Sequence, residues 1–93
     1  MSAHDTDIEV SAVMPCLNEE ETIAKCIEKA TNCFARLGVR GEVVVGDNCS
    51  TDRSAEIAKS LGARVVHEHV MGYGAALAAA IEASRGKFVI MAD

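Results

Sequence analysis

The strongest constraint on the fold is a regular alternation between two kinds of segment. Runs rich in β-branched residues occupy positions 8–14, 42–45, 63–67 and 87–92, and the three segments between them carry apolar residues at helical spacing. Short connections of this kind produce a parallel sheet with right-handed crossovers and helices on its faces. The sequence therefore predicts an α/β fold of order β-α-β-α-β-α-β, with helices on both faces of the sheet.

Turn and capping residues predict where these elements begin and end. The first strand is expected to close into a turn at Pro15, which cannot donate a backbone hydrogen bond. Asn18 is expected to cap the first helix and Gly38 to end it. Ser50 or Thr51 is expected to cap the second helix. The last strand is expected to be buried.

Length and composition limit the class of protein. The 93 residues suffice for one domain, expected over residues 8–93 with a frayed segment at 1–7. A net charge of -5 argues against nucleic-acid binding, which needs an excess of basic residues. The N-terminus lacks the pattern of a signal peptide, and no stretch is long enough to span a membrane. Four cysteines without a C-x-x-C pair indicate free thiols, so we expect a cytoplasmic location.

The first strand-to-helix turn excludes the commonest nucleotide-binding designs. Its sequence, PCLNEE at 15–20, contains no glycine, whereas a dinucleotide-binding fold places G-x-G-x-x-G there. Gly86-Lys87 is not preceded by the glycine-rich loop of a Walker motif. The sequence therefore argues against both an NAD-binding design and a P-loop.

Carboxylates and amides follow three of the predicted strands. They are found at 18–20 after the first strand, at Asp47 and Asn48 after the second, and at Asp93 on the fourth. In a parallel sheet these ends share one edge, so the side chains are expected to converge on one crevice. Oxygen groups of this kind accept hydrogen bonds from bases and riboses and bind Mg²⁺ or Mn²⁺. The pattern suits a nucleoside diphosphate bridged to a divalent metal.

Four motifs in order carry a family resemblance over nearly the whole chain from Ile8 onward. VMPCLNEEETI, EVVVGDNCSTDRSAEIA, GYGAALAAAI and GKFVIMAD resemble the N-terminal half of an inverting family 2 glycosyltransferase. More narrowly, they are similar to the polyprenyl-phosphate (dolichol-phosphate) mannosyl- and glucosyltransferase-like branch. The resemblance implies a GT-A fold, a UDP- or GDP-linked sugar donor, and a polyprenyl phosphate as acceptor.

The resemblance also implies roles for individual residues. The first loop lies against the nucleoside, the residues after the second strand meet the base, and two glycines lie near the diphosphate. Asp93 matches the first aspartate of a D-x-D motif that binds the ribose and the metal-bridged diphosphate. The residues implied in nucleotide binding are Pro15, Leu17, Glu19 or Glu20, Asp47, Asn48, Gly72, Gly74 and Asp93, with Asp93 also as metal ligand.

Three positions depart from the family pattern. Tyr73 stands where many relatives have a lysine, Asn48 where a second aspartate is usual, and Cys49 where glycine is usual. A side chain at position 49 predicts strain if that turn requires a positive φ. No residue of the chain matches the catalytic base.

The resemblance further implies that the chain ends inside the D-x-D motif, before the second aspartate, the base and the acceptor surface. We therefore expect the 93-residue chain alone to keep part of the donor site and to lack transferase activity. An exposed sheet edge would favour homo-oligomers. The alternatives are a catalytically silent nucleotide-binding or self-associating module and, less favoured, another nucleotide binder such as a nucleotidyltransferase. The family context places the full-length protein at the cytoplasmic face of a membrane.

Two further residue types have a structural interpretation. His67 and His69 lie on one side of an extended segment, as zinc ligands can, but without a third ligand they are interpreted as exposed loop residues. Cys16 has no histidine partner at a suggestive distance, so packing is favoured over a nucleophilic role.

Overall fold

The computed structural model describes residues 7–92. Asp93 and all of the expected frayed segment except Asp7 lie outside the described residues. Strands and helices alternate in the predicted order. They are β1 (Val10–Cys16), α1 (Ile23–Leu37), β2 (Gly41–Asp47), α2 (Ser54–Ser60), β3 (Arg64–His67), α3 (Tyr73–Ala83) and β4 (Phe88–Met91).

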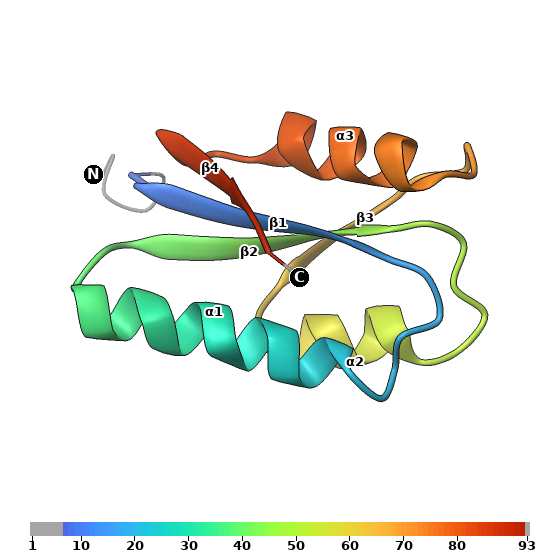
Figure 1. The fold of residues 1–93 in the computed structure, drawn as a ribbon, viewed down its shortest axis with the longest axis horizontal. Helices are drawn as coiled ribbons and strands as arrows, with labels where there is room; N and C mark the ends of the chain where they lie inside the picture. The colour runs from blue at the N-terminus through green and yellow to red at the C-terminus, as the bar shows by residue number, and fades with distance from the viewer. Residues whose placement is uncertain (1–6, 93) are drawn as a thin grey trace.

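The four strands form one sheet of order β3-β2-β1-β4, and every pair is parallel. Helices α1 and α2 cover one face of the sheet and α3 covers the other (Figure 1). The carboxyl ends of β1, β2 and β3 therefore lie at the same edge. The predicted α/β fold with helices on both faces is confirmed. Among the described residues, no helix combines the length and the apolar character needed to cross a membrane.

Alternate residues of the central strands supply two separate cores. Ala12, Met14, Val43 and Val45 face α1 and α2, where Ile23, Ile27 and Phe34 of α1 complete the larger core. On the other face, Val13 and Val44 pack against Ala80 of α3. The alanine-rich sequence of α3 lets this helix approach the sheet closely, because its inner side chains end at Cβ.

The first strand continues past the expected stop. Pro15 lies inside β1, in register with Gly46, and β1 ends at Cys16. Pro15 lies two residues beyond Val13, which pairs with Met91 at the end of the ladder with β4. Residues 13 and 15 direct their backbone groups to the same side of the strand, and β4 has ended before Pro15, so the missing N–H interrupts no ladder bond.

The helix starts were also predicted too early. Thr22 occupies the N-cap position of α1 and Arg53 that of α2, and neither helix has a side-chain cap. Asn18 adopts a left-handed backbone (φ 51°) instead of capping α1. The predicted end of α1 is correct, since Gly38 forms its C-cap with φ 68°, a conformation that glycine adopts without strain.

Strand β4 differs most from expectation. Its four residues are all exposed, and Phe88 and Met91 each retain 68% of their accessible surface. The strand pairs with β1 on one side only, and α3 packs over β1, β2 and β3. The expectation of a buried last strand is therefore wrong for the described residues: β4 is an apolar edge strand.

At the amino ends of the strands, a polar network connects β1 and β2 to the segment before β4. The hydroxyl of Ser11, itself fully buried, donates to Glu42 Oε2 (2.6 Å) and accepts from the N–H of Gly86 (2.9 Å). Glu42 also accepts from the N–H of Arg85 (2.7 Å) and pairs with Arg64 (3.0 Å). Partial burial raises the pKa of Glu42, but the hydrogen bonds from Ser11, Arg85 and Arg64 outweigh it and hold the pKa below its ordinary value of 4.5.

We expect Glu42→Gln to lower the free energy of unfolding at pH 7 by about 1–3 kcal/mol, because it removes a charge bonded to three partners. A lowered carboxyl pKa stabilises the fold above the unfolded pKa, and this contribution is lost as the pH falls through the folded value. The difference from the wild type should therefore shrink as the pH falls below 4.5. Denaturant titrations of the variant and the wild type at pH 7 and pH 3.5 measure the loss of stability and its decrease at low pH. Glu56→Gln is the control, because Glu56 forms an exposed surface pair with Arg53. Equal losses in both variants would contradict the prediction.

Candidate functional site

The loops that follow β1 and β2 are joined by hydrogen bonds at the carboxyl edge of the sheet. Asn18 Oδ1 accepts the backbone N–H groups of Thr51 (2.8 Å) and Asp52 (3.2 Å). Asp52 Oδ2 accepts the N–H of Glu20 (3.1 Å), and Glu20 in turn accepts the N–H of Arg53 (3.3 Å). Asn18, Glu20 and Asp52 therefore hold the two loops together.

Asn48 connects the loop after β2 to the loop before α3. Its Nδ2 donates to the carbonyl oxygens of Glu68 (3.0 Å) and Val70 (2.9 Å), and its Oδ1 accepts the N–H of Gly72 (2.8 Å). The residue is 4% exposed. The next residue, Cys49, has φ 67°, so the positive φ that favours glycine at this turn is present.

Asp47 ends β2 and is almost completely buried, with 3% of its surface exposed. Its Oδ2 lies 3.3 Å from Nδ1 of His67 and accepts the N–H of Ser50 at 3.4 Å. Its Oδ1 has no hydrogen-bond partner within the described residues and is shielded from solvent. A ligand atom therefore reaches Oδ1 only when a neighbouring side chain moves aside.

A cavity of about 370 Å³ opens at the same edge of the sheet, between the first loop and the start of α3. Five residues implied by the family resemblance line it. The lining consists of Pro15, Cys16, Leu17, Glu19, Asn48, Met71, Gly72, Tyr73 and Ala76. The volume is in the range of small-molecule sites, and the walls are largely apolar with a few polar groups.

The other residues implied by the resemblance lie elsewhere. Glu20 lines a separate acidic hollow with Asp52, so Glu19 is the glutamate of the pair that reaches the main cavity. Gly74 lies within α3, and neither Gly74 nor Asp47 is among the residues that line the cavity, although Asp47 precedes the lining residue Asn48 in the chain. Asp93 lies outside the described residues. The structure therefore brings together the three loops but leaves the proposed metal ligand undescribed.

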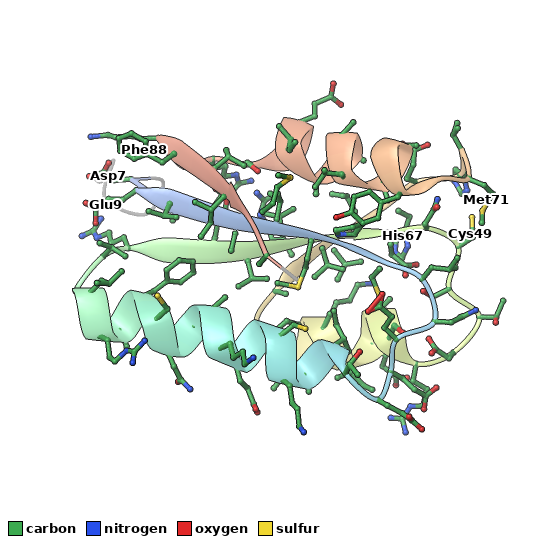
Figure 2. The ribbon with its side chains drawn as sticks, viewed as in Figure 1. Asp7, Glu9, Cys49, His67, Met71 and Phe88 are labelled. Atoms are coloured by element: carbon green, nitrogen blue, oxygen red, sulfur yellow. The ribbon has the colours of Figure 1, made fainter. Side chains whose placement is uncertain are left out.

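The sequence interpretation gave no role in the site to three residues at this edge. Met71 and Tyr73 form part of the cavity wall, and both are more than half exposed. His67 was interpreted as a loop residue, but it is the last residue of β3, in register with Asp47. Figure 2 shows His67, Cys49 and Met71 gathered at this end of the sheet, far from Phe88 at the other end. The available signal was that the second and third predicted strands end on an aspartate and a histidine.

The cysteines have the expected chemistry. All four are free thiols, and Cys16 is buried with 2% of its surface exposed. Burial raises the pKa of the Cys16 thiol, and the negative charges of Asp47 and Glu19 raise it further against hydrogen bonds from Ser54 and Ser50. A thiol of raised pKa is a poor nucleophile, so packing is its role. Over residues 7–92, no group of three or more His, Cys, Asp or Glu side chains is arranged to hold a metal.

The sequence that forms this site can be compared with those of known proteins. The sequence model described as "Glycosyl transferase family 2" matches residues 11–93. The chain belongs to this family.

Two curated relatives illustrate the range of the match. The chain is 46% identical over 91 residues to the low-salt glycan biosynthesis hexosyltransferase Agl6 of Haloferax volcanii, covering 96% of this chain and 22% of the relative. It is 34% identical over 91 residues to the undecaprenyl-phosphate 4-deoxy-4-formamido-L-arabinose transferase of Pseudomonas aeruginosa, covering 90% of this chain and 27% of the relative. The family 2 chain thus spans about a quarter of the length of these relatives.

Solved structures agree with the fold. Mannosyl-3-phosphoglycerate synthase of Rubrobacter xylanophilus matches with a TM-score of 0.80 and 31% identity, over 92% of this chain and 31% of the other. Glucosyl-3-phosphoglycerate synthase of Mycobacterium tuberculosis, in complex with Mn²⁺, UDP and glucosyl-3-phosphoglycerate, matches with a TM-score of 0.65 and 30% identity, over 98% and 36%. The described residues therefore form part of a GT-A fold.

Proposed function

We propose that the full-length protein carrying this chain is an inverting glycosyltransferase that moves a sugar from a nucleotide donor to a polyprenyl phosphate. These residues supply the nucleotide half of its donor site. The observation that carries the proposal is the buried carboxylate of Asp47, whose Oδ1 has no partner among the described residues, beside an apolar cavity at the carboxyl edge of a parallel sheet. Ligands of open α/β folds bind at such an edge.

Each candidate residue has a role in this proposal. Asp47 accepts an N–H of the base, while Pro15 and Leu17 pack against the nucleoside and Glu19 accepts a ribose hydroxyl. Gly72 and Gly74 leave room for the diphosphate at the start of α3, where the helix dipole favours negative charge. Glu20 and Asn48 act on the loops, since their side-chain oxygens accept backbone N–H groups of neighbouring loops.

A divalent metal completes the proposed site. Asp93 is its expected ligand, as the first residue of the D-x-D motif, and Mg²⁺ or Mn²⁺ would neutralise the departing diphosphate. Support comes from the similar synthase crystallised with Mn²⁺ and UDP. Among residues 7–92 no three His, Cys, Asp or Glu side chains are grouped to hold a metal, so the proposal assigns the metal to Asp93.

We expect Asp47→Ala to weaken binding of the preferred nucleoside diphosphate at least tenfold, because it removes a charged acceptor from the base. Isothermal titration of the full-length protein with UDP and with GDP, each with Mn²⁺, measures this effect. Glu28→Ala, on the exposed side of α1, is the matched control and should bind as the wild type does. Undiminished binding by the Asp47 variant, or failure of the wild type to bind either nucleotide, would contradict the proposed function.

The acceptor and the location are inferred from the similarity to one relative, the undecaprenyl-phosphate sugar transferase of Pseudomonas aeruginosa. A polyprenyl phosphate acceptor places the working protein at the cytoplasmic face of a membrane. Sugar transfer from a panel of UDP- and GDP-sugars to a polyprenyl phosphate tests the reaction directly. Transfer to soluble acceptors only would contradict this choice of acceptor.

Strand β4 supports a second proposal, self-association of the isolated chain. Phe88, Val89, Ile90 and Met91 are exposed, and the outer backbone edge of β4 pairs with no described strand. An exposed, apolar edge strand is a template for pairing with another chain. We expect the 93-residue chain to sediment as a dimer or larger assembly, and Ile90→Lys to shift it towards monomer. A wild-type monomer at high concentration would contradict this expectation.

A further inference from the structure

The pairing between His67 and Asp47 has a consequence for which base the site accepts. The two residues occupy the same register position at the ends of β3 and β2. Nδ1 of His67 lies 3.3 Å from Asp47 Oδ2, and 51% of the His67 side chain remains exposed while that of Asp47 is 4% exposed. His67 therefore fixes the rotation of the carboxylate from the solvent side.

The two oxygens of Asp47 are consequently unequal. Oδ2 has two partners, the His67 ring and the backbone N–H of Ser50. Oδ1 has none among residues 7–92, although it is shielded from solvent. A buried carboxylate oxygen without a donor is unfavourable, and a ligand N–H placed against it removes that penalty. Once a neighbouring side chain moves aside to admit a ligand, Asp47 thus offers it one acceptor and not two.

Uracil and guanine differ in the number of N–H donors that they present to a carboxylate. The pairing edge of uracil has one N–H between two carbonyl groups, so it suits one acceptor, and a second free carboxylate oxygen would face a carbonyl. The pairing edge of guanine has two adjacent N–H donors, which suit both oxygens of a carboxylate. We propose that His67, by occupying Oδ2, makes Asp47 a single acceptor and so selects a uracil nucleotide over a guanine nucleotide. This inference rests on the proposed function, in which Asp47 contacts the base.

His67 is a positioning residue in this scheme, since it acts through Asp47. The test measures the dissociation constants of UDP and GDP, each with Mn²⁺, for the full-length wild type, His67→Ala, His67→Asn and His69→Ala. We expect a wild-type preference for UDP that falls at least fivefold in His67→Ala, because Oδ2 then keeps only the long hydrogen bond from the Ser50 N–H (3.4 Å) among the described residues and can accept a second N–H of the base. His67→Asn should retain most of the preference, since its amide nitrogen can stand near the position of Nδ1. His69→Ala, a neighbouring exposed histidine, should match the wild type.

The possible outcomes separate this inference from the proposed function. An unchanged UDP-to-GDP ratio in His67→Ala, or an equal loss of both affinities, would overturn the role of His67 and leave nucleotide binding intact. A wild-type preference for GDP would also overturn it alone. Binding of neither nucleotide by the wild type would end the proposed function and this inference with it. If His67→Ala does not fold, the ratio for His67→Asn and the shift of the His67 imidazole resonances decide: a shift with UDP but not with ribose 5-phosphate supports the role, and its absence opposes it.

Discussion

Replacing Gly46 with alanine is expected to lower the free energy of unfolding by more than about 3 kcal/mol, the largest effect predicted for any single methyl group in this chain. A Cβ on Gly46 would lie 2.1 Å from the carbonyl oxygen of Ala76 and 2.9 Å from its carbonyl carbon. These atoms belong to the backbone of α3, which cannot rotate away as a side chain can. The helix would have to move off the sheet, and Ala76 also lines the candidate cavity.

Chemical denaturation and nucleotide titration of Gly46→Ala measure both consequences. Gly74→Ala is the matched control for the denaturation, because its added Cβ would meet no atom within 4 Å and its φ is not positive, and exposed Glu28→Ala is the control for the nucleotide titration. Since Gly74 lies inside α3, that variant should be as stable as the wild type or slightly more stable. Equal stability of the two variants would show that α3 is not in close contact with β2.

The second large effect is expected for Asn48→Asp. This substitution should release the loop between β3 and α3 and lower the free energy of unfolding by about 2–4 kcal/mol. The substitution keeps the shape of the side chain but replaces its Nδ2 by an oxygen that faces the carbonyl oxygens of Glu68 and Val70. Two donated hydrogen bonds become repulsive contacts in a buried position. The two hydrogen bonds donated by Nδ2 give a structural reason for asparagine at position 48.

Hydrogen exchange of the Gly72 amide reports this release directly, because that N–H donates to Asn48 Oδ1 in the wild type. We expect its protection to fall at least tenfold and the affinity for nucleotide to fall with it. Asn32→Asp adds the same charge at an exposed position of α1 and should leave both unchanged. Retained protection of Gly72 in Asn48→Asp would mean that the loop does not depend on the hydrogen bonds of the Asn48 side chain.

Several features of the site required contacts between residues far apart in the chain. Asn48 and Asp47 are neighbours after one strand and were both assigned to the nucleotide. The structure separates them: Asn48 binds the loop before α3, whereas Asp47 keeps one oxygen without a partner in the described part of the chain. His67 seemed an isolated loop histidine because its partner is 20 residues earlier. Sequence patterns do not identify such partners, since strand register and loop path decide which side chains meet.

The sequence by itself determined the order of the elements, the parallel sheet with helices on both faces, and the edge where polar side chains gather. These follow from local periodicity and from the short connections, which leave few arrangements open. Only the tertiary structure decided that β1 runs through Pro15, that α3 lies too close to β2 for any side chain at Gly46, and that β4 is exposed. These outcomes depend on which strand or helix lies beside each residue, and the spacing of residues along the chain does not contain that information.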